Sequence, residues 1–282
     1  SSGDPIPAEA AEIRAVITNG ILGLPPVLEA ALPALGLVAV SGVGLDAIDL
    51  EAMRRRGVKV TTARGALEED VADLAIGLWL ATARQLITGD RFVREGHWET
   101  GGRFPLARSV NRKRAGVLGM GAIGQGIAKR AEAFGCEVRY TTRRPVAAVP
   151  WTRVPDLTDL AAWADVLFVI VPGGPANVGL VSARVLEALG PSGILVNVAR
   201  GEVVDEAALI AALEAGKLGG AGLDVFEREP NVPQGLRSRD DVVLAPHVGS
   251  ATVEARGAMA DIVVGNLQAF FAGRGSEIKA LV

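Results

Sequence analysis

The sequence has little of several residue types that mark particular classes of protein. Its 282 residues include a single cysteine, Cys136, so no disulfide can form within the chain, and a reducing, cytoplasmic location is expected. The uninterrupted apolar runs, such as residues 166–171, are far shorter than the roughly 20 residues that cross a bilayer. The formal net charge is −3, and the basic trios at 54–56 and 112–114 are short. Nucleic acid and membranes are therefore not expected as partners.

Composition and length instead fit a soluble globular protein with two domains. The chain is 49% hydrophobic and 22% charged, and 282 residues are enough for two hydrophobic cores. Apolar runs with strand character alternate with stretches of helical spacing, which predicts an α/β fold built on parallel sheets. The strands are expected in two groups: 13–18, 37–40 and 58–61, then 115–118, 137–141, 166–171, 194–198, 220–225 and 242–245.

Helical spacing between these strands predicts the remaining elements and the domain boundaries. The stretch 70–84 is apolar almost all round, so we expect it to be buried between domains or subunits and to form a dimer contact. The closing helix, 252–271, is expected to return to the first domain. The expected domains are thus residues 1–70 with 252–282, and residues 71–251. Further helices are expected after Pro25-Pro26 and near 46–56, 122–134, 158–163, 182–189 and 205–215.

A glycine-rich turn at 119–124 is the first sign of function. It follows the apolar run 115–118 and opens a stretch of helical spacing, and the next strand completes a strand–helix–strand unit. In such a unit the glycines let the backbone approach a pyrophosphate, whose charge then lies at the N–H groups of the first helical turn. The turn therefore predicts a dinucleotide site.

The residues after the next strand indicate which dinucleotide binds. An acidic residue usually stands about 20 residues after the glycines and accepts a hydrogen bond from the ribose 2′-hydroxyl. Here Thr142 occupies that region, and Arg143 and Arg144 follow it. A carboxylate would repel a 2′-phosphate, whereas Thr142 can donate to it and Arg143 can pair with it through two N–H groups. The segment favours NADP(H), with NAD(H) as the weaker alternative; the other interpretation is a solvated turn before Pro145.

Six strand-end segments of the second group contain residues that are unusual in simple turns. Ligands of open α/β sheets bind beyond the carboxyl ends of the strands, so these segments are expected to converge on one crevice. The segments are 119–121, 142–144, 171–174, 198–201, 224–227 and 246–250. The candidate cofactor-binding residues are Gly119, Met120, Gly121, Ala122, Ile123, Gly124, Thr142, Arg143, Arg144, Val171, Pro172, Val198, Ala199, Arg200, Asp224, His247, Gly249 and Ser250.

Several blocks, taken in order, resemble the D-2-hydroxyacid dehydrogenase family, and within it the NADPH-dependent glyoxylate, hydroxypyruvate and hydroxyphenylpyruvate reductases. The resemblance implies an NADP-binding domain at 71–251 and a substrate-binding domain at 1–70 with 252–282. It further implies that both domains are Rossmann-like, that the active site lies in the interdomain cleft, and that the protein is a homodimer. The usual opening strand and helix of the first domain are missing. The blocks are SGVGLDAID (41–49), DVAD (70–73), the glycine turn, NVARG (197–201), GLDVFEREP (222–230) and PHVGS (246–250).

The same resemblance assigns a catalytic trio, Arg200, Glu229 and His247. Reduction of a 2-keto acid needs a hydride from nicotinamide and a proton at the ketone oxygen, and histidine is suited to deliver that proton near neutral pH. Glu229 would orient and charge-stabilise the His247 ring, and Arg200 would hold the substrate and polarise its carbonyl. Backbone N–H groups of Val43 and Gly44 would bind the substrate carboxylate. No metal is expected.

The expected reaction is therefore the NADPH-dependent reduction of a small 2-keto acid, of the glyoxylate/hydroxypyruvate class, to the D-2-hydroxy acid. Two alternatives remain. One is a dinucleotide-sensing corepressor, a binding protein on the same fold, against which the complete trio argues. The other is a formate dehydrogenase-like enzyme, which is disfavoured because Glu229 stands where relatives of that enzyme carry glutamine and because position 142 holds no aspartate.

Some individual residues also have a simpler interpretation. His247 could be a solvated turn residue after Pro246, and Asp224 could stabilise a turn instead of accepting from the nicotinamide amide. Glu227 competes with Glu229 for the role beside the histidine. His97, the other histidine of the chain, lies in none of the strand-end segments and is interpreted as structural or interfacial.

Overall fold

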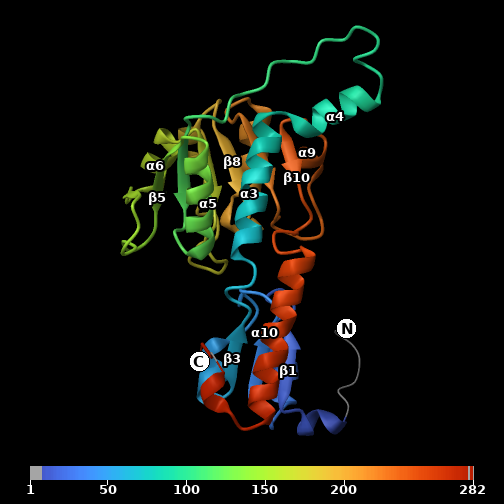
Figure 1. Ribbon diagram of the computed structural model, residues 1–282, viewed down its shortest axis with the longest axis vertical. Coiled ribbons are helices and arrows are strands. Elements are labelled where there is room, and N and C mark those ends of the chain that lie inside the picture. Colours follow the sequence, from blue (N-terminus) through green and yellow to red (C-terminus); the bar gives the residue numbers. More distant parts are fainter. Residues whose placement is uncertain (1–7, 279, 282) are drawn as a thin grey trace. The chain divides into compact units, whose positions relative to one another are not determined.

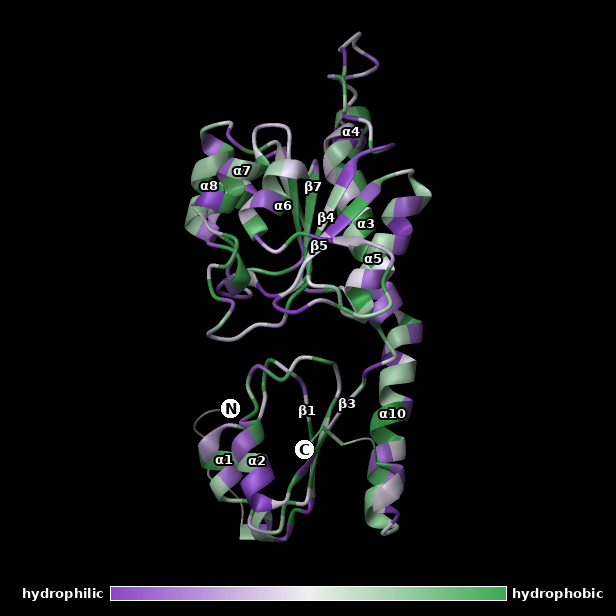
Figure 2. Ribbon diagram, turned by 90° about the vertical axis from the view of Figure 1, so that its left-hand side faces the viewer, coloured by the Kyte–Doolittle hydropathy of each residue, from purple (hydrophilic) through white to green (hydrophobic). Residues whose placement is uncertain are grey.

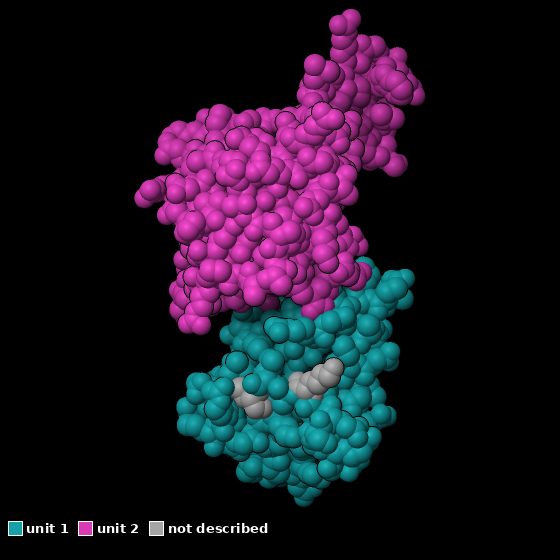
Figure 3. Space-filling view, turned by 60° about the vertical axis from the view of Figure 1, so that its left-hand side comes forward, with its two compact units in different colours: residues 1–67, 250–282 teal, residues 68–249 magenta. Residues whose placement is uncertain are grey.

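The structure is a computed structural model that describes residues 8–278 and 280–281, and it divides into two compact units. Unit 1 contains residues 1–67 and 250–282, and unit 2 contains residues 68–249 (Figure 3). Unit 2 is continuous in sequence and begins with helix α3 (Glu68–Ala83). Unit 1 is assembled from both ends of the chain, because helix α10 (Val253–Phe271) packs on its strand β2 (Leu37–Val40).

Unit 1 is a three-stranded parallel sheet with helices on both faces. Its order is β1 (Ala15–Thr18), β2 and β3 (Lys59–Thr62). Helices α1 (Pro26–Ala30) and α2 (Leu50–Arg56) lie on one side and α10 on the other (Figure 2). All four residues of β2 are fully buried, with Val38 and Val40 in one apolar cluster and Leu37 in another. The uninterrupted apolar run of this strand is therefore the pattern of a strand covered on both faces.

Helix α2 begins later than the sequence suggested. It was expected from residue 46 but starts at Leu50, because the Asp49 carboxylate accepts a hydrogen bond from the Ala52 N–H at 2.9 Å and caps the first turn. The helix ends at Gly57, whose φ of 68° is the left-handed conformation that glycine adopts without steric cost.

Unit 2 is a seven-stranded parallel sheet in the order β10-β9-β8-β7-β4-β5-β6. Helices α3 and α5 (Ala122–Ala133) cover one face, and α6 (Leu157–Trp163), α7 (Ala183–Leu189) and α8 (Glu206–Glu214) cover the other (Figures 1 and 2). The predicted α/β fold with parallel sheets is confirmed. The strands are β4 (Arg114–Leu118), β5 (Glu137–Thr141), β6 (Thr152–Arg153), β7 (Val166–Val169), β8 (Ile194–Asn197), β9 (Gly220–Leu223) and β10 (Val242–Leu244).

Several boundaries and short elements differ from the sequence-based expectation. β7 ends at Val169 and β9 at Leu223, two residues before the predicted ends at 171 and 225, so the strand-end segments begin earlier. Elements that the apolar periodicity did not indicate are α4 (Leu86–Arg94), β6, α9 (Gln234–Arg237) and the 3₁₀ helices Ala8–Glu12, Gly201–Val203 and Gly275–Glu277. β6, α9 and the 3₁₀ helices are too short to produce a clear period, whereas α4 has the apolar and polar faces of an amphipathic helix and was missed.

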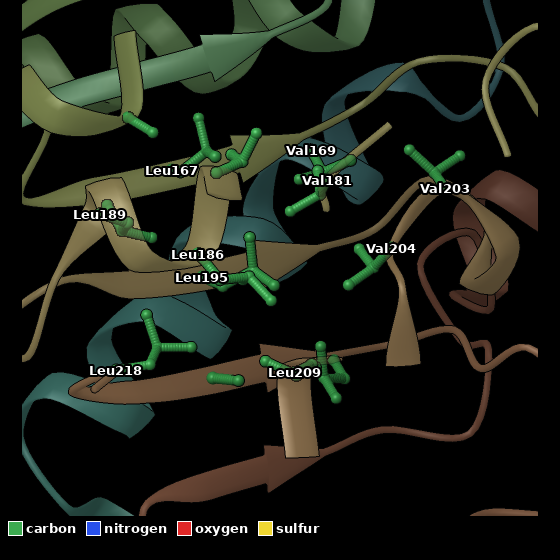
Figure 4. Close-up of a cluster of buried hydrophobic side chains, with 14 of the residues drawn as sticks. Leu167, Val169, Val181, Leu186, Leu189, Leu195, Val203, Val204, Leu209 and Leu218 are labelled. Carbon is green, nitrogen blue, oxygen red and sulfur yellow. The ribbon is translucent and has the colours of Figure 1, made fainter. Parts of the chain in front are cut away.

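A dense apolar core fixes the face of unit 2 opposite α3. Leu186, Leu195 and Leu209 are almost completely buried there, and they come from α7, β8 and α8 respectively (Figure 4). Close packing of branched side chains from helices and strands holds the strands in register. The carboxyl ends of these strands, where the candidate site residues lie, are thus attached to a rigid frame.

Helix α3 is buried by unit 2 itself. It packs against α5, β8 and β9, and Val71, Ala75 and Leu78 are among its buried residues. The Trp79 ring meets the edges of Phe134 and Phe168 at centroid distances of 5.8 Å each. The apolar surface at 70–84 is therefore accounted for without a second subunit, and the homodimer remains a prediction.

Among residues 8–278 and 280–281, no helix is long and apolar enough to cross a membrane. No group of three or more histidine, cysteine, aspartate or glutamate residues that could hold a metal ion is found in the same described part.

The close packing of α3 on β9 gives a stability test. A Cβ at Gly222 would lie 2.9 Å from the Leu78 Cβ, whereas a Cβ at Gly77 of the same helix would have nothing within 4 Å. Gly222→Ala should lower the free energy of unfolding by about 1–3 kcal/mol through overpacking. Gly77→Ala should raise it by about 0.5–1 kcal/mol, because a helical glycine is replaced without a clash. Denaturant unfolding of both variants checks this, and a Gly222→Ala protein as stable as the parent would contradict the packing.

Candidate active site

The glycine turn between β4 and α5 has three glycines with three distinct environments. Gly119 has a φ of 104°, and a Cβ there would lie 2.3 Å from the Ile170 carbonyl oxygen. Gly121 is exposed, and a Cβ there would have nothing within 4 Å. A Cβ at Gly124 would lie 2.1 Å from the Gly119 carbonyl oxygen. In a pyrophosphate-binding unit, the first glycine allows a tight turn, the second leaves space for the pyrophosphate to approach the backbone, and the third allows close contact of helix and strand. Gly119, Gly121 and Gly124 fit these three positions in that order.

Helix α5 presents its N-terminus at the open position. Gly121 is the N-cap, and it supplies no side-chain hydrogen bond to the first turn. Backbone N–H groups of a first helical turn have no partner within the helix and carry partial positive charge. Ala122 and Ile123 lie in this turn, and Met120 precedes it as a buried residue. The turn therefore fits a dinucleotide pyrophosphate.

The segment after β5 places two arginines at the surface. Arg143 and Arg144 are exposed, while the Thr142 hydroxyl donates to the Arg144 carbonyl oxygen at 2.7 Å. The hydroxyl that was expected to donate to a 2′-phosphate thus has a local acceptor. The guanidinium groups are the accessible donors of this segment.

The segments after β7 and β8 are joined to each other. After β7, the Asn177 side-chain amide donates to the Pro172 carbonyl oxygen at 2.8 Å, next to Val171. The Gly174 N–H donates to Glu202 Oε1 at 2.6 Å, and Glu202 lies two residues after Arg200. The role of Glu202 was not foreseen, because a glutamate in a loop has no sequence signal that distinguishes a tether from a solvated side chain.

Asn197 shapes the turn that carries Arg200. Its Oδ1 accepts from the Ala199 N–H at 3.0 Å and its Nδ2 donates to the Arg200 carbonyl oxygen at 3.0 Å. Val198 and Ala199 are buried, and Arg200 is partly exposed. A Cβ at Gly201 would lie 1.8 Å from the Phe226 carbonyl carbon, so glycine is required for this backbone to reach the segment after β9.

Glu229 and His247 form a direct pair. His247 Nδ1 lies 2.7 Å from Glu229 Oε2, and the two side chains are 32% and 28% exposed. The other carboxylate oxygen, Oε1, accepts from the Phe226 N–H at 3.0 Å. With Nδ1 engaged by the carboxylate, Nε2 is the ring nitrogen left to exchange a proton with a ligand. Glu229 rather than Glu227 therefore contacts the histidine.

The surroundings keep the Glu229 carboxylate ionised. Burial is the largest single influence and would raise the pKa of Glu229. The hydrogen bonds from His247 and the Phe226 N–H, with the charges of His247 and Arg200, outweigh burial and lower that pKa below its usual value. A carboxylate that is negative at neutral pH attracts a protonated imidazole. Arg200 thus lies within electrostatic reach of the pair.

Asp224 holds the turn on which His247 lies. Its side chain is 2% exposed, and its oxygens accept from the Val248 N–H at 2.7 Å and the Gly249 N–H at 2.9 Å. Its carbonyl oxygen accepts from the His247 N–H at 2.8 Å. Burial raises the pKa of Asp224, and the two backbone hydrogen bonds act against that rise. The turn-stabilising interpretation of Asp224 is the one that these contacts support.

The held turn includes an unusual backbone conformation. His247 has a φ of 55°, in the left-handed region that residues other than glycine seldom adopt. Such a conformation persists only where its surroundings impose it, and it is found often at functional sites. The three hydrogen bonds to Asp224 supply that constraint.

A pocket of about 230 Å³ adjoins the pair within unit 2. Apart from Glu229 and His247, its lining is mostly apolar, with Phe226, Pro230, Val232, Leu244, Ala245 and Pro246. An apolar wall lowers the local dielectric and strengthens the hydrogen bond between the carboxylate and the ring. Val232 and Leu244 were not foreseen, since ordinary aliphatic residues carry no sequence signal of a site.

The remaining predicted residues belong to unit 1. Val43 and Gly44 follow β2, and Ser250 begins the return of the chain to unit 1. Their parts in binding substrate or cofactor stay predictions. The residues that unit 2 gathers at the carboxyl edge of its sheet are those of a dinucleotide-binding α/β protein with a hydrogen-bonded Glu–His pair.

Comparison with known proteins gives the same class. Residues 76–249 match the family described as D-isomer specific 2-hydroxyacid dehydrogenase, NAD binding domain. Hydroxyphenylpyruvate reductase of Plectranthus scutellarioides is 47% identical, over 94% of this chain and 85% of its own length. Glyoxylate/hydroxypyruvate reductase A HPR2 of Arabidopsis thaliana is 48% identical, over 93% of this chain and 83% of its own.

A solved structure extends the likeness to three dimensions. The NADPH-dependent glyoxylate/hydroxypyruvate reductase of Sinorhizobium meliloti, crystallised with NADP and malonate, matches with a TM-score of 0.90 and 46% identity. The match covers 94% of this chain and 83% of that one. The chain therefore belongs to the D-isomer specific 2-hydroxyacid dehydrogenase family, a family of oxidoreductases, and the predicted resemblance is confirmed.

Asp224 can be tested against a second aspartate of unit 2. In Asp224→Asn the amide NH₂ would face one of the two backbone N–H donors, so we expect a loss of about 1–3 kcal/mol in the free energy of unfolding and a lower kcat. Asp205 accepts only from the Ala208 N–H, as the N-cap of α8, and asparagine caps helices equally well. Asp205→Asn should therefore leave both quantities nearly unchanged. Denaturant unfolding and steady-state kinetics make the comparison; equal effects of the two substitutions would contradict the assigned role.

Proposed function

We propose that the protein reduces a small 2-keto acid of the glyoxylate/hydroxypyruvate class to the D-2-hydroxy acid, with NADPH as the preferred cofactor. The main observation in support is the 2.7 Å contact between His247 Nδ1 and Glu229 Oε2, which lies at the same edge of the sheet as the glycine turn. The names of the similar proteins support the substrate class, since they reduce glyoxylate, hydroxypyruvate or hydroxyphenylpyruvate.

His247 is the proposed proton donor. Glu229 binds Nδ1 and stabilises the positive ring, so that Nε2 can deliver its proton to the keto oxygen as negative charge develops there. When bound, the reduced nicotinamide supplies the hydride for the keto carbon. Each turnover leaves the histidine neutral, and a proton from solvent restores it.

Arg200 is the proposed substrate anchor. Its guanidinium can bind a carboxylate through two parallel N–H groups and can polarise the adjacent carbonyl. The Asn197 side chain fixes the backbone of this residue through its hydrogen bonds to Ala199 and Arg200. The charge of Arg200 and the ionised Glu229 lie close enough to influence each other, so the arginine also helps to keep the carboxylate negative.

The proposed cofactor site follows the strand ends of unit 2. The N-terminus of α5 and Gly121 would hold the pyrophosphate, and Arg143 the 2′-phosphate. Val171, Pro172, Val198 and Ala199 would line the groove between these groups and the trio, with Thr142 and Arg144 beside the 2′-phosphate. Two exposed guanidinium groups and the absence of an acidic residue at 142–144 support NADP(H) over NAD(H).

The two alternative functions are less well supported. A dinucleotide-sensing corepressor does not need a hydrogen-bonded Glu–His pair beside an apolar pocket. A formate dehydrogenase does not need a proton donor, and Glu229 occupies the position where its relatives carry glutamine. The similar proteins described above are reductases of keto acids.

We further propose a homodimer, with its contact on residues 86–106 and not on α3. Helix α4 and the loop after it stand out from the sheet of unit 2 (Figure 1). Several large apolar side chains there are exposed: Leu86 by 53%, Ile87 and Val93 by 52%, Trp98 by 68% and Leu106 by 98%. Clustered exposed apolar side chains are typical of protein contacts.

The chain has only two histidines, which gives a matched test of the proton donor. His247→Ala should reduce turnover of glyoxylate or hydroxypyruvate by about a hundred- to ten-thousandfold, because general acid catalysis is lost. NADPH binding, measured by fluorescence titration, should persist. His97 is exposed and pairs with Glu95, so His97→Ala should leave turnover nearly unchanged. Near-normal turnover of both glyoxylate and hydroxypyruvate in His247→Ala would refute the mechanism.

Cofactor preference is tested at Arg143. Loss of a charge-assisted hydrogen bond to the 2′-phosphate costs roughly 1.5–3 kcal/mol, so Arg143→Ala should weaken NADPH binding by about ten- to a hundredfold. NADH binding should not change. Arg139 pairs instead with Glu137 and packs over Trp163, so Arg139→Ala is the control and should leave the ratio unaltered. An unchanged ratio of NADPH to NADH affinity in Arg143→Ala would remove this part of the proposal.

A further inference from the structure

Strand β6 is only two residues long, yet it places a third arginine beneath the 142–144 segment. β6 pairs in parallel with β5 at the edge of the sheet, and Arg153 is the register partner of Tyr140. Register partners in neighbouring strands point to the same face of a sheet. Arg153 and Tyr140 therefore lie side by side, directly before the segment that leaves β5.

Both side chains bind the backbone of this segment. Arg153 Nε and Nη2 donate to the Thr142 carbonyl oxygen at 3.1 and 2.7 Å, and Nη2 lies 3.4 Å from the Arg143 carbonyl oxygen. The Tyr140 hydroxyl accepts from the Val146 N–H at 3.3 Å. The segment is thus fixed near both of its ends, and the guanidinium of Arg153 is engaged with backbone.

These contacts orient the peptide groups of the segment. In a trans peptide the C=O of one residue and the N–H of the next point in opposite directions. Because the carbonyl groups of Thr142 and Arg143 are turned toward Arg153, the N–H groups of Arg143 and Arg144 face away from it. No hydrogen bond from either N–H is recorded within residues 8–278 and 280–281. Two backbone donors and two guanidinium groups therefore belong to the exposed side of one short turn.

We propose that Arg153 is a positioning residue for cofactor choice. Its planar guanidinium binds the Thr142 and Arg143 carbonyl oxygens together and so holds the 142–144 turn in the conformation that binds a 2′-phosphate. The proposal rests on the NADP preference proposed above. A preorganised turn loses little conformational entropy on binding, so removing Arg153 should weaken ligands that carry the 2′-phosphate and spare those that lack it.

The geometry also separates positioning from simple attraction. A lysine would keep the positive charge near the phosphate, but its ammonium is a point charge that does not reproduce the planar fork on two carbonyl groups. If the planar contact with both carbonyl groups matters, Arg153→Lys and Arg153→Met both lose the preference for ligands that carry the 2′-phosphate. If only the charge matters, Arg153→Lys retains it.

The experiment measures binding of adenosine 2′,5′-bisphosphate and of 5′-AMP by calorimetry to the full-length protein, without any turnover. For Arg153→Met we expect the affinity ratio of the two ligands to fall about tenfold, which corresponds to about 1.4 kcal/mol. Arg153→Lys should show most of that fall, while 5′-AMP affinity stays unchanged in both variants. Arg139→Met, in which the altered arginine binds Glu137, is the matched control and should keep the parent ratio.

The outcomes distinguish this inference from the proposed function. The parent protein's preference for adenosine 2′,5′-bisphosphate over 5′-AMP could be lost in Arg143→Ala but kept in Arg153→Met or Arg153→Lys. That result overturns the inference and leaves the proposed function standing. A parent protein that binds both ligands equally overturns the NADP preference and the inference together, whereas keto-acid reduction with either cofactor still tests the reaction. If an Arg153 variant loses as much affinity for 5′-AMP as for adenosine 2′,5′-bisphosphate, the whole site has collapsed, and the positioning role is contradicted. Thermal melting of each variant identifies misfolding.

Discussion

The hydrogen bonds to the buried residue Asp224 are the interaction on which the Glu229–His247 pair depends. Its side-chain oxygens accept hydrogen bonds from the Val248 and Gly249 N–H groups, and its backbone carbonyl oxygen accepts one from the His247 N–H. These bonds hold His247 at a φ of 55° and bring its ring to Glu229, which is itself fixed by the Phe226 N–H. The cost of burying the Asp224 side chain directly after β9 is thus offset by hydrogen bonds from the backbone of the turn after β10. Its burial serves to place the histidine.

The parallel sheet supplies the wider constraint. Because every strand of unit 2 runs in the same direction, the turns after β4, β5, β7, β8, β9 and β10 all leave one edge. Side-chain contacts with backbone then connect some of these turns, Glu202 to Gly174 and Arg153 to Thr142, and Asn197 fixes the turn after β8 through its bond to Arg200. Glu202 and Arg153 are polar side chains that position a neighbouring turn. Ligand-binding groups can therefore be loop residues and still be held rigidly.

Much of this arrangement could be predicted from the sequence. Fully buried strands such as Leu37–Val40 are continuous apolar runs in the sequence. In the glycine turn, glycine stands at the positions where a Cβ would clash with the backbone. The pairing of Glu229 with His247, in preference to Glu227, also agreed with the family motif. The two-residue strand β6 could not be predicted because it is too short to show a period, whereas α4 was missed although its apolar and polar residues lie on different faces.

The side-chain partners were the least predictable part. The Thr142 hydroxyl, expected to bind a phosphate, donates to the Arg144 carbonyl oxygen, and helix α3, expected to lie between domains or subunits, packs against α5, β8 and β9. These partners could not be predicted because composition shows which groups need a partner, whereas only the fold shows which partner lies nearest. The same reasoning explains why Glu202 and Arg153 gave no signal of a role.

The central claim, that the Glu229–His247 pair delivers a proton to a keto acid, is tested most directly by a crystal structure of the protein with NADPH and oxamate, an unreactive keto-acid analogue. The account predicts His247 Nε2 within about 2.6–3.2 Å of the oxamate oxygen that represents the keto group, with Nδ1 still bound to Glu229. An oxamate bound beside the nicotinamide but out of hydrogen-bond reach of His247 would contradict it.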